Sequence, residues 1–408
     1  MGREISFIHA ADLHLDSLFK GLANTPEHIF QEIRESTFRA LDRLVQTAID
    51  KKVDFVLIVG DLFDNEAQSL KSQIRLKKAF EALNRHNIYV YMSYGNHDFI
   101  NGNIHPVTFP ENVFIFPDEQ VRHFIYEKDG EPLVAIYGFS YENRAVNNKK
   151  TTEYEIQRKD VSYHIATLHG SLKSNTAHDV YAPFQLTDLT EKDFNYWALG
   201  HIHKREILKE NPPIIYPGNI QGRNRKETGE KGCYHVVLSE SNVTMSFIPL
   251  QAIAFRPLMV DVSACTEAGQ METYIQTALD AIKQDTAQLL DLTLVSDNPK
   301  LKQWENDKYV EDIIELINET TAHQQNWTYI FRYAVQTHVS DMDMEQAKGD
   351  HFIGELSRHF DETSIQPFMK ALYQQKSARK FVDLLTGDEE REVKSEAKSL
   401  LLNELLKE

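Results

Sequence analysis

The stretch Ile5-Ser6-Phe7-Ile8-His9-Ala10-Ala11-Asp12-Leu13-His14 decides the fold class of this chain. Its apolar first half predicts a short buried strand. The strand ends in an Asp-x-His pair, and ligands usually bind at the strand ends of an open α/β sheet. Carboxylate oxygens and neutral imidazole nitrogens both ligate divalent transition metals well. Because Asp-x-His pairs also occur in ordinary polar loops, this stretch alone leaves a purely structural role open.

Four further apolar runs end in the same kinds of side chain, and this repetition favours a shared site. The predicted strands are residues 53–59, 88–92, 163–168 and 197–199. The polar motifs that follow them are Gly60-Asp61-Leu62-Phe63-Asp64, Gly95-Asn96-His97-Asp98, His169-Gly170 and Gly200-His201-Ile202-His203. Ordinary polar loops would have to produce this pattern five times together. The sequence therefore predicts a metal site built at the ends of several strands.

Composition limits the compartment and the class of protein. The 408 residues suggest two or three domains, and 41% hydrophobic with 26% charged residues is typical of a soluble globular protein. We expect no membrane span, since the chain has no apolar run of about 18 residues. We likewise expect no secretory signal, because the first residues lead directly into a predicted strand. The two cysteines, Cys233 and Cys265, have no ligand-like spacing and suit a reducing cytoplasm.

The net charge of −17 is unfavourable for an enzyme that binds nucleic acid, because phosphate contacts normally need Lys and Arg. Net charge is not the local field, however. The stretch Arg223-Asn224-Arg225-Lys226 is basic, and metal ions would add positive charge at the site.

Hydrophobic spacing predicts crossover helices at residues 36–51 and 70–85, followed by many short strands from residue 113 to residue 249. A domain boundary is expected near Phe255-Arg256-Pro257. A β-α-β-α-β pattern follows, with strands at 258–262, 289–295 and 328–336 and helices at 272–283 and 309–320. Residues 342–408 are predicted to be helical, and the last helix, 390–406, has an apolar stripe along one face.

The five motifs resemble those of the calcineurin-like metallophosphoesterases. The later segments Tyr216-Pro217-Gly218-Asn219 and Gly229-Glu230-Lys231-Gly232-Cys233 resemble the SbcD-type DNA repair nucleases, in their YhaO-like branch. Periodicity alone indicates only an α/β fold. The resemblance implies a four-layer α/β sandwich with a small α+β capping domain and a helical C-terminal region. The expected limits are 1–255 for the nuclease domain, 256–340 for the capping domain and 341–408 for the helical region.

The resemblance also implies two divalent cations that share one carboxylate. Asp61 is the expected bridging ligand. Manganese is the ion that the family implies, with magnesium, iron or zinc as alternatives, and the spacing does not select among them. One cation would take Asp12, His14, Asp61 and His203, and the other would take Asp61, Asn96, His169 and His201.

Other residues receive supporting roles from the same resemblance. His97 is expected to act on the leaving oxygen as a catalytic acid. Asp98 either orients His97 or caps a loop, and Asp64 is expected to accept a hydrogen bond behind a ligand. Arg223, Arg225 and Lys226 are expected to hold the DNA backbone, the alternative being a solvated loop.

The function expected from these observations is a metal-dependent DNA nuclease in DNA repair, acting as a 3′→5′ exonuclease and also as an endonuclease. The alternatives are a phosphodiesterase or phosphatase for small substrates, and a DNA-end-binding scaffold subunit. The expected partners are DNA, an SbcC-type ATPase with a coiled coil, and a second copy of the chain. The C-terminal helices either dock that ATPase or pack on the core.

Overall fold

The computed structural model describes most of the chain up to residue 337 and parts of the region beyond it. The described ranges are 4–19, 21–22, 25–64, 68–102, 107–173, 180–240, 242–282 and 285–337, followed by 355, 358–360, 363–375, 385, 387, 389–391, 393–394 and 397. The predicted helix at 390–406 lies largely outside the described residues.

The first of two six-stranded sheets has the order β12-β11-β1-β2-β3-β4. Strands β1 to β4 run parallel to one another, while β11 and β12 extend the sheet in antiparallel fashion. Parallel strands carry their carboxyl ends to one edge, so the loops after β1, β2 and β3 meet there. The strands are β1 (Ile5–Ala10), β2 (Phe55–Val59), β3 (Tyr89–Ser93), β4 (Val113–Ile115), β11 (Gly232–Leu238) and β12 (Val243–Pro249).

The second sheet has the order β5-β6-β7-β8-β10-β9 and packs face to face with the first. Strands β6, β7, β8 and β10 are parallel, so the ends of β7 and β8 also lie at one edge. The strands are β5 (Arg122–Lys128), β6 (Glu131–Gly138), β7 (Tyr163–His169), β8 (Tyr196–Gly200), β9 (Glu206–Glu210) and β10 (Pro213–Tyr216).

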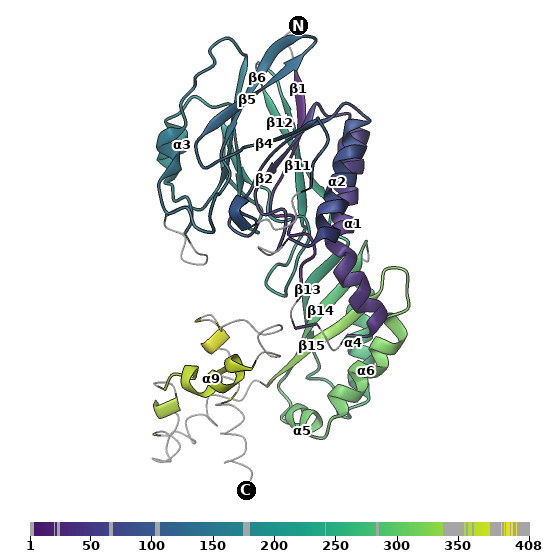
Figure 1. Ribbon diagram of the computed structural model, residues 1–408. Helices are drawn as coiled ribbons and strands as arrows, with labels where there is room; N and C mark the ends of the chain where they lie inside the picture. The colour runs from purple at the N-terminus through teal and green to yellow at the C-terminus, as the bar shows by residue number, and fades with distance from the viewer. Residues whose placement is uncertain are drawn as a thin grey trace.

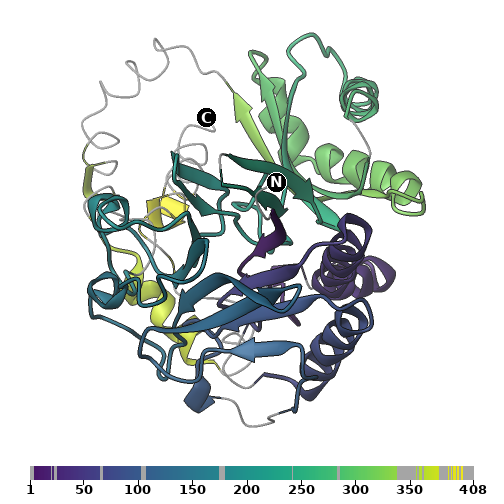
Figure 2. The same cartoon turned by 90° about the horizontal axis from the view of Figure 1, so that it is seen from above.

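Apolar residues fill the space on both faces of each sheet. Phe7, Phe55 and Tyr196 form part of the core between the sheets. Helices α1 (Glu27–Lys51) and α2 (Leu70–Asn84) cover the outer face of the first sheet and lie side by side (Figure 2). Loops with the short helices η1 (Ile100–Gly102), η2 (Lys150–Glu153) and α3 (Leu186–Thr190) lie on the outer side of the second sheet. The expected four-layer α/β sandwich is confirmed.

The predicted start of helix α1 at residue 36 was wrong, because the helix begins nine residues earlier, at Glu27. Its first turns bury Ile29 and Ile33, which pack against Leu289 and Trp327 of the following module. Figure 1 shows α1 extending from the sandwich to the sheet beside α4 and α6. The early turns therefore belong to a contact between modules, and this contact is invisible to a periodicity search within one domain.

A three-stranded parallel sheet follows, with the order β13-β14-β15. Its strands are β13 (Ile253–Asp261), β14 (Ala287–Ser296) and β15 (Thr328–Thr337), and α4 (Gln270–Asp280), α5 (Lys300–Asn306) and α6 (Tyr309–Thr321) cover one face. The boundary expected at 255–257 lies inside β13, because an edge strand accommodates Pro257. Helix α5 was not predicted, and the division into three domains stays a prediction.

Beyond the third sheet the described part of the chain includes α9 (Gln366–Gln374). Within the described ranges, none of the helices is long and apolar enough to cross a bilayer.

Candidate metal centre

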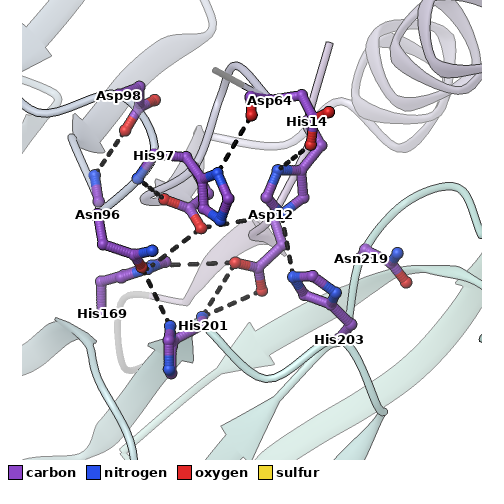
Figure 3. A network of polar contacts seen from close by, with 12 residues as sticks. Asp12, His14, Asp64, Asn96, His97, Asp98, His169, His201, His203 and Asn219 are labelled. Atoms are coloured by element: carbon purple, nitrogen blue, oxygen red, sulfur yellow. Dashed lines mark hydrogen bonds and ion pairs between the residues drawn. The ribbon is translucent and has the colours of Figure 1, made fainter. Parts of the chain in front are cut away.

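The polar motifs after β1, β2, β3, β7 and β8 converge at one edge of the sandwich (Figure 3). The two sheets contribute from opposite sides. The first sheet supplies Asp12, His14, Asp61 and Asn96, and the second supplies His169, His201 and His203. The structure thus brings together all seven predicted metal ligands.

The first cluster at this edge consists of Asp12, His14 and His203, whose ligand atoms lie within 4.8 Å of one another. The Nε2 atoms of His14 and His203 are 3.0 Å apart. Asp12 is fully buried, and its carboxylate accepts the backbone N–H of His201 at 3.0 and 3.1 Å. One carboxylate and two imidazoles that face a common point fit a divalent transition metal.

The second cluster contains Asp61, His169 and His201, also within 4.8 Å. The amide oxygen of Asn96 lies 3.0 Å from His169 Nε2 and 3.1 Å from His201 Nδ1. Asp61 Oδ2 is 3.5 Å from His169 Nε2 and 3.8 Å from His14 Nε2. Asp61 therefore lies between the two clusters, at the position expected of a shared ligand.

The local backbone at this edge contains several residues in a strained conformation. Non-glycine residues rarely adopt positive φ, and each case costs about 1–3 kcal/mol. Four residues of the two clusters do so: Asp12 at 52°, His14 at 41°, Asp61 at 51° and His201 at 95°. The tight turns after the strands aim these side chains back into the edge of the sheets.

Two glycines of the motifs are required by close approach. A Cβ at Gly60, which has φ of 75°, would lie 2.2 Å from His169 Nδ1. A Cβ at Gly95 would lie 2.3 Å from a carboxylate oxygen of Asp61. Both glycines therefore let the second cluster pack directly against the backbone of the neighbouring loops.

The Nδ1 atom of each of three imidazoles faces an oxygen atom, and in His169 and His203 this contact is a hydrogen bond. His169 Nδ1 is 3.0 Å from the carbonyl oxygen of Val59, and this nitrogen must donate because a carbonyl only accepts. His203 Nδ1 is 2.8 Å from Glu227 Oε1, and His14 Nδ1 is 3.3 Å from Asp64 Oδ1. In all three rings the Nε2 atom then faces the clusters, which is the arrangement that a metal-binding histidine needs.

Asp64 and Glu227 are joined by one guanidinium. Arg223 is ion-paired with Asp64 and lies 3.8 Å from Glu227 Oε1. Its side chain is only 15% exposed, so it is engaged by carboxylates rather than displayed to solvent. The predicted phosphate contact of Arg223 stays a prediction. Glu227 was missed by sequence reasoning, although its place directly after the basic stretch 223–226 is a signal that could have found it.

His97 lies beside the second cluster without joining it. Its backbone N–H donates to Asp61 at 3.0 Å, and its Nδ1 donates to the carbonyl oxygen of Asp64 at 3.1 Å. Asp98 was expected either to orient this ring or to cap a loop, and it accepts the N–H groups of Leu62 at 2.6 Å and Gly95 at 2.7 Å. Asp98 therefore joins two loops, and the backbone of Asp64 orients His97.

The other predicted DNA contacts lie on the loop that carries Glu227. Arg225 is 3.6 Å from Asp291 of β14, and Lys226 Nζ is 3.1 Å from Glu389. The side chain of Lys226 is 51% exposed. This loop thus connects the metal centre, the three-stranded sheet and the C-terminal region.

Burial and neighbouring charges shift the pKa values of the cluster residues. Burial, followed by the charge of Arg223, lowers the pKa of His14 to about 3, which keeps its imidazole neutral and able to bind a metal. Burial raises the pKa of Asp12. Although burial opposes both changes, mutual attraction holds the pKa of Asp61 well below its usual value and raises that of His169 to about 9.

The pKa values of the two supporting carboxylates, Glu227 and Asp98, are shifted in opposite directions. Although burial opposes it, Arg223 and His203 hold the pKa of Glu227 well below its ordinary value, so this group is an anion. Burial and the charge of Asp61 raise the pKa of Asp98 to about 7. The acceptor of His203 is thus a fixed negative charge, while Asp98 sits among backbone donors.

The chain also matches known proteins. Residues 5–205 match the family model described as calcineurin-like phosphoesterase. A protein of Bacillus subtilis described as uncharacterized metallophosphoesterase YhaO is 35% identical over 407 residues, 98% of each chain. The chain belongs to the calcineurin-like metallophosphoesterase family. The resemblance seen in the five motifs is therefore confirmed, and members of this family bind divalent metals.

More distant relatives of this metallophosphoesterase carry a more specific description. A DNA double-strand break repair protein, Mre11, of Methanocaldococcus jannaschii is 26% identical over 258 residues, 59% of this chain and 65% of its own. The Mre11 of Sulfolobus acidocaldarius is 22% identical over 309 residues, 71% of this chain and 75% of its own.

Proposed function

We propose that this metallophosphoesterase is a metal-dependent DNA nuclease that hydrolyses phosphodiester bonds in DNA repair. The observation that carries the proposal is the pair of clusters at one edge, with Asp61 between them. Two cations about 3.5–4 Å apart suit the in-line displacement at a phosphodiester, because each can neutralise charge on one reacting oxygen. The description of the Mre11 relatives supports DNA as the substrate.

The ligands divide between two cations. Asp12, His14 and His203 would hold one, and Asn96, His169 and His201 the other, with Asp61 shared. The donor set contains oxygen and imidazole nitrogen but no thiolate, which suits manganese and also magnesium, iron or zinc. When bound, such cations polarise the phosphate and lower the pKa of water.

His97 supplies the proton in this proposal. Its Nδ1 is occupied by the carbonyl oxygen of Asp64, so its Nε2 is the nitrogen available to a substrate. In the imidazolium form, Nε2–H donates its proton to the leaving oxygen as the P–O bond breaks, and the ring becomes neutral.

We further propose 3′→5′ exonuclease action with additional endonuclease action. We also propose a cytoplasmic location, which the buried free cysteines Cys233 and Cys265 suit.

The test is digestion of end-labelled linear DNA with Mn²⁺, run beside bis(p-nitrophenyl) phosphate and a cyclic nucleotide. We expect DNA to be degraded from its 3′ end, and a chelator to stop the reaction. Asp61→Asn is the inactive control. Turnover of the small esters without cleavage of DNA would identify a small-substrate phosphodiesterase, and DNA binding without turnover would identify a scaffold subunit.

We also propose that the C-terminal region docks an SbcC-type ATPase and that the chain forms a homodimer. Helix α9 supports docking, because Phe368 and Leu372 are exposed and lie one turn apart on one face. Phe368→Ala should weaken co-purification with the ATPase, whereas Lys370→Ala, on the same helix, should not. Equal retention of both variants would contradict the docking proposal, and a monomeric mass in solution would contradict the dimer.

A further inference from the structure

A chain of charged side chains contacts two imidazoles of the first cluster at Nδ1, the nitrogen that faces away from the cluster. His203 Nδ1 is 2.8 Å from Glu227, and His14 Nδ1 is 3.3 Å from Asp64. Arg223 lies between the two carboxylates and contacts both. The opposite nitrogens of the two imidazoles meet 3.0 Å apart. The five side chains therefore close a ring, which we call the Arg223 ring.

Glu227 occupies a position in this ring that only a carboxylate can fill. Its Oε2 accepts Asn219 Nδ2 at 2.7 Å and the backbone N–H of Arg223 at 2.8 Å, and its Oε1 faces His203. The side chain is 11% exposed. An ionised carboxylate has no proton to donate, so His203 Nδ1 must carry the hydrogen of this contact. Its Nε2 then keeps the lone pair.

His203 is also fixed through its backbone. Lys231 Nζ donates to the carbonyl oxygen of His203 at 2.9 Å, and this lysine is almost fully buried. The backbone N–H of Asn219 bonds to the same carbonyl at 3.3 Å. The main chain and the ring of His203 are therefore both anchored by the segment 219–231, which follows β10.

We propose that Glu227, held in place by Arg223, is a positioning residue that locks the Nδ1-protonated tautomer of His203 and so presents Nε2 to the cation. At the other end of the Arg223 ring, Asp64 places a carboxylate 3.3 Å from His14 Nδ1. This inference rests on the proposed metal-dependent function. It assigns residues outside the five motifs to the metal centre, and it gives Arg223 a task that requires no contact with DNA.

The substitution Glu227→Gln tests the lock because it preserves shape while adding a donor. Three donors face the carboxylate, and a glutamine has only one acceptor oxygen. If its NH₂ group faces His203, Nδ1 must accept, and the hydrogen moves to Nε2, which blocks ligation. If its oxygen faces His203, the NH₂ group opposes Asn219 and the Arg223 N–H. Loss of such a supporting partner typically costs about 10–100-fold in metal affinity.

The matched control is Glu230→Gln, which makes the same chemical change three residues further along. Glu230 is 58% exposed and is paired with Arg205 rather than with a cluster histidine. Both variants change the net charge equally, so a difference between them reports the contact with His203. The measurement is calorimetric titration of the full-length, metal-free protein with Mn²⁺.

We expect two sites in the wild type, selective weakening of one by about 10–100-fold in Glu227→Gln, and no change in Glu230→Gln. Identical isotherms for the two variants would overturn the positioning role. A wild type that binds no metal would overturn the proposed function itself, so the two failures are distinguishable. A histidine-labelled ¹⁵N spectrum of the metal-free protein reads the tautomer directly, and the Nδ1–H signal of His203 should disappear only in Glu227→Gln.

If Glu227→Gln does not fold, Arg223→Lys carries the test. A lysine keeps the charge but, as a single ammonium, does not bridge two carboxylates as a guanidinium does. We expect this variant to weaken the same site while leaving the other intact. Wild-type affinity at both sites in folded Arg223→Lys would contradict the role of the Arg223 ring.

Discussion

The two clusters of the candidate metal centre are supported in different ways. In the first cluster, His14 and His203 face the carboxylates of Asp64 and Glu227. Both carboxylates are in turn paired with Arg223. In the second cluster, His169 is held by the carbonyl oxygen of Val59, which is part of strand β2 itself. Side chains thus support the two imidazoles of the first cluster, whereas main chain supports His169 in the second.

This difference determines which substitutions can reach each cluster. A main-chain acceptor survives any substitution that leaves the strand intact. Outside its own side chains, the second cluster should therefore be sensitive mainly at Gly60 and Gly95, where an added Cβ would collide with His169 and Asp61. A side-chain acceptor can be neutralised without touching a ligand. The metal affinity of the first cluster can therefore be changed by substituting a residue that is not itself a ligand.

The largest effect should come from Asp61→Asn, because Asp61 lies between the clusters and belongs to both. We expect the variant to lose affinity for both cations and to hydrolyse DNA no faster than the background. Metal analysis and the DNA digestion assay measure this. The exposed Asp50→Asn, in the last turn of α1, is the control and should behave as wild type. Two full equivalents of metal in Asp61→Asn would show that the clusters do not share this ligand.

His97→Ala should have the next largest effect, and it should spare both clusters. General-acid groups typically contribute about 10²–10⁴-fold to a rate. We therefore expect a loss of cleavage in that range, with metal content and DNA affinity unchanged and with His86→Ala, an exposed histidine, as the control. Near-normal cleavage by this variant would remove His97 from the mechanism.

Asn96→Ala should weaken the binding of one cation only. The affected site should be the second cluster, whereas Glu227→Gln should affect the first. The amide oxygen of Asn96 contacts His169 and His201 but no residue of the first cluster. We expect a loss of at least about 10-fold in affinity at a single site, and His201→Ala should match it. If Asn96→Ala and Glu227→Gln weakened the same site in a Mn²⁺ titration, the assignment of ligands to two cations would be wrong.

The smallest effect should come from Lys226→Ala, which probes the substrate rather than the clusters. Removal of one phosphate contact should reduce DNA affinity a few-fold and lower the salt dependence of binding by about one unit of slope. Lys159→Ala is the control, because Lys159 is exposed near the start of β7, at the opposite end from His169. An unchanged slope in Lys226→Ala would remove this residue from the DNA contact.

The sequence predicted which side chains meet at the edge of the sheets, but it did not predict the residues that hold them in place. Apolar runs that end in Asp, Asn or His follow from the rule that parallel strands deliver their ends to one place, and seven side chains meet there as expected. The support of His203 comes from Glu227, which follows no strand and belongs to no motif. Its contact depends on how the loop after β10 folds back, and hydrophobic spacing carries no information on that.

The same limit explains the error at the start of α1. The first turns of α1 looked polar within their own domain, because Ile29 and Ile33 pack against residues that come more than 200 positions later. This error therefore concerns a contact between modules, on which periodicity within one domain carries no information.

The positive φ angles of Asp12, His14, Asp61 and His201 bear on how this chain can evolve. At about 1–3 kcal/mol each, they draw on a margin of stability that is typically only about 5–15 kcal/mol. Random substitutions elsewhere use the same margin, at about 1 kcal/mol apiece. This edge of the sheets therefore limits how many neutral changes the distant core can accumulate, and a relative that lost these turns would tolerate a faster drift of sequence.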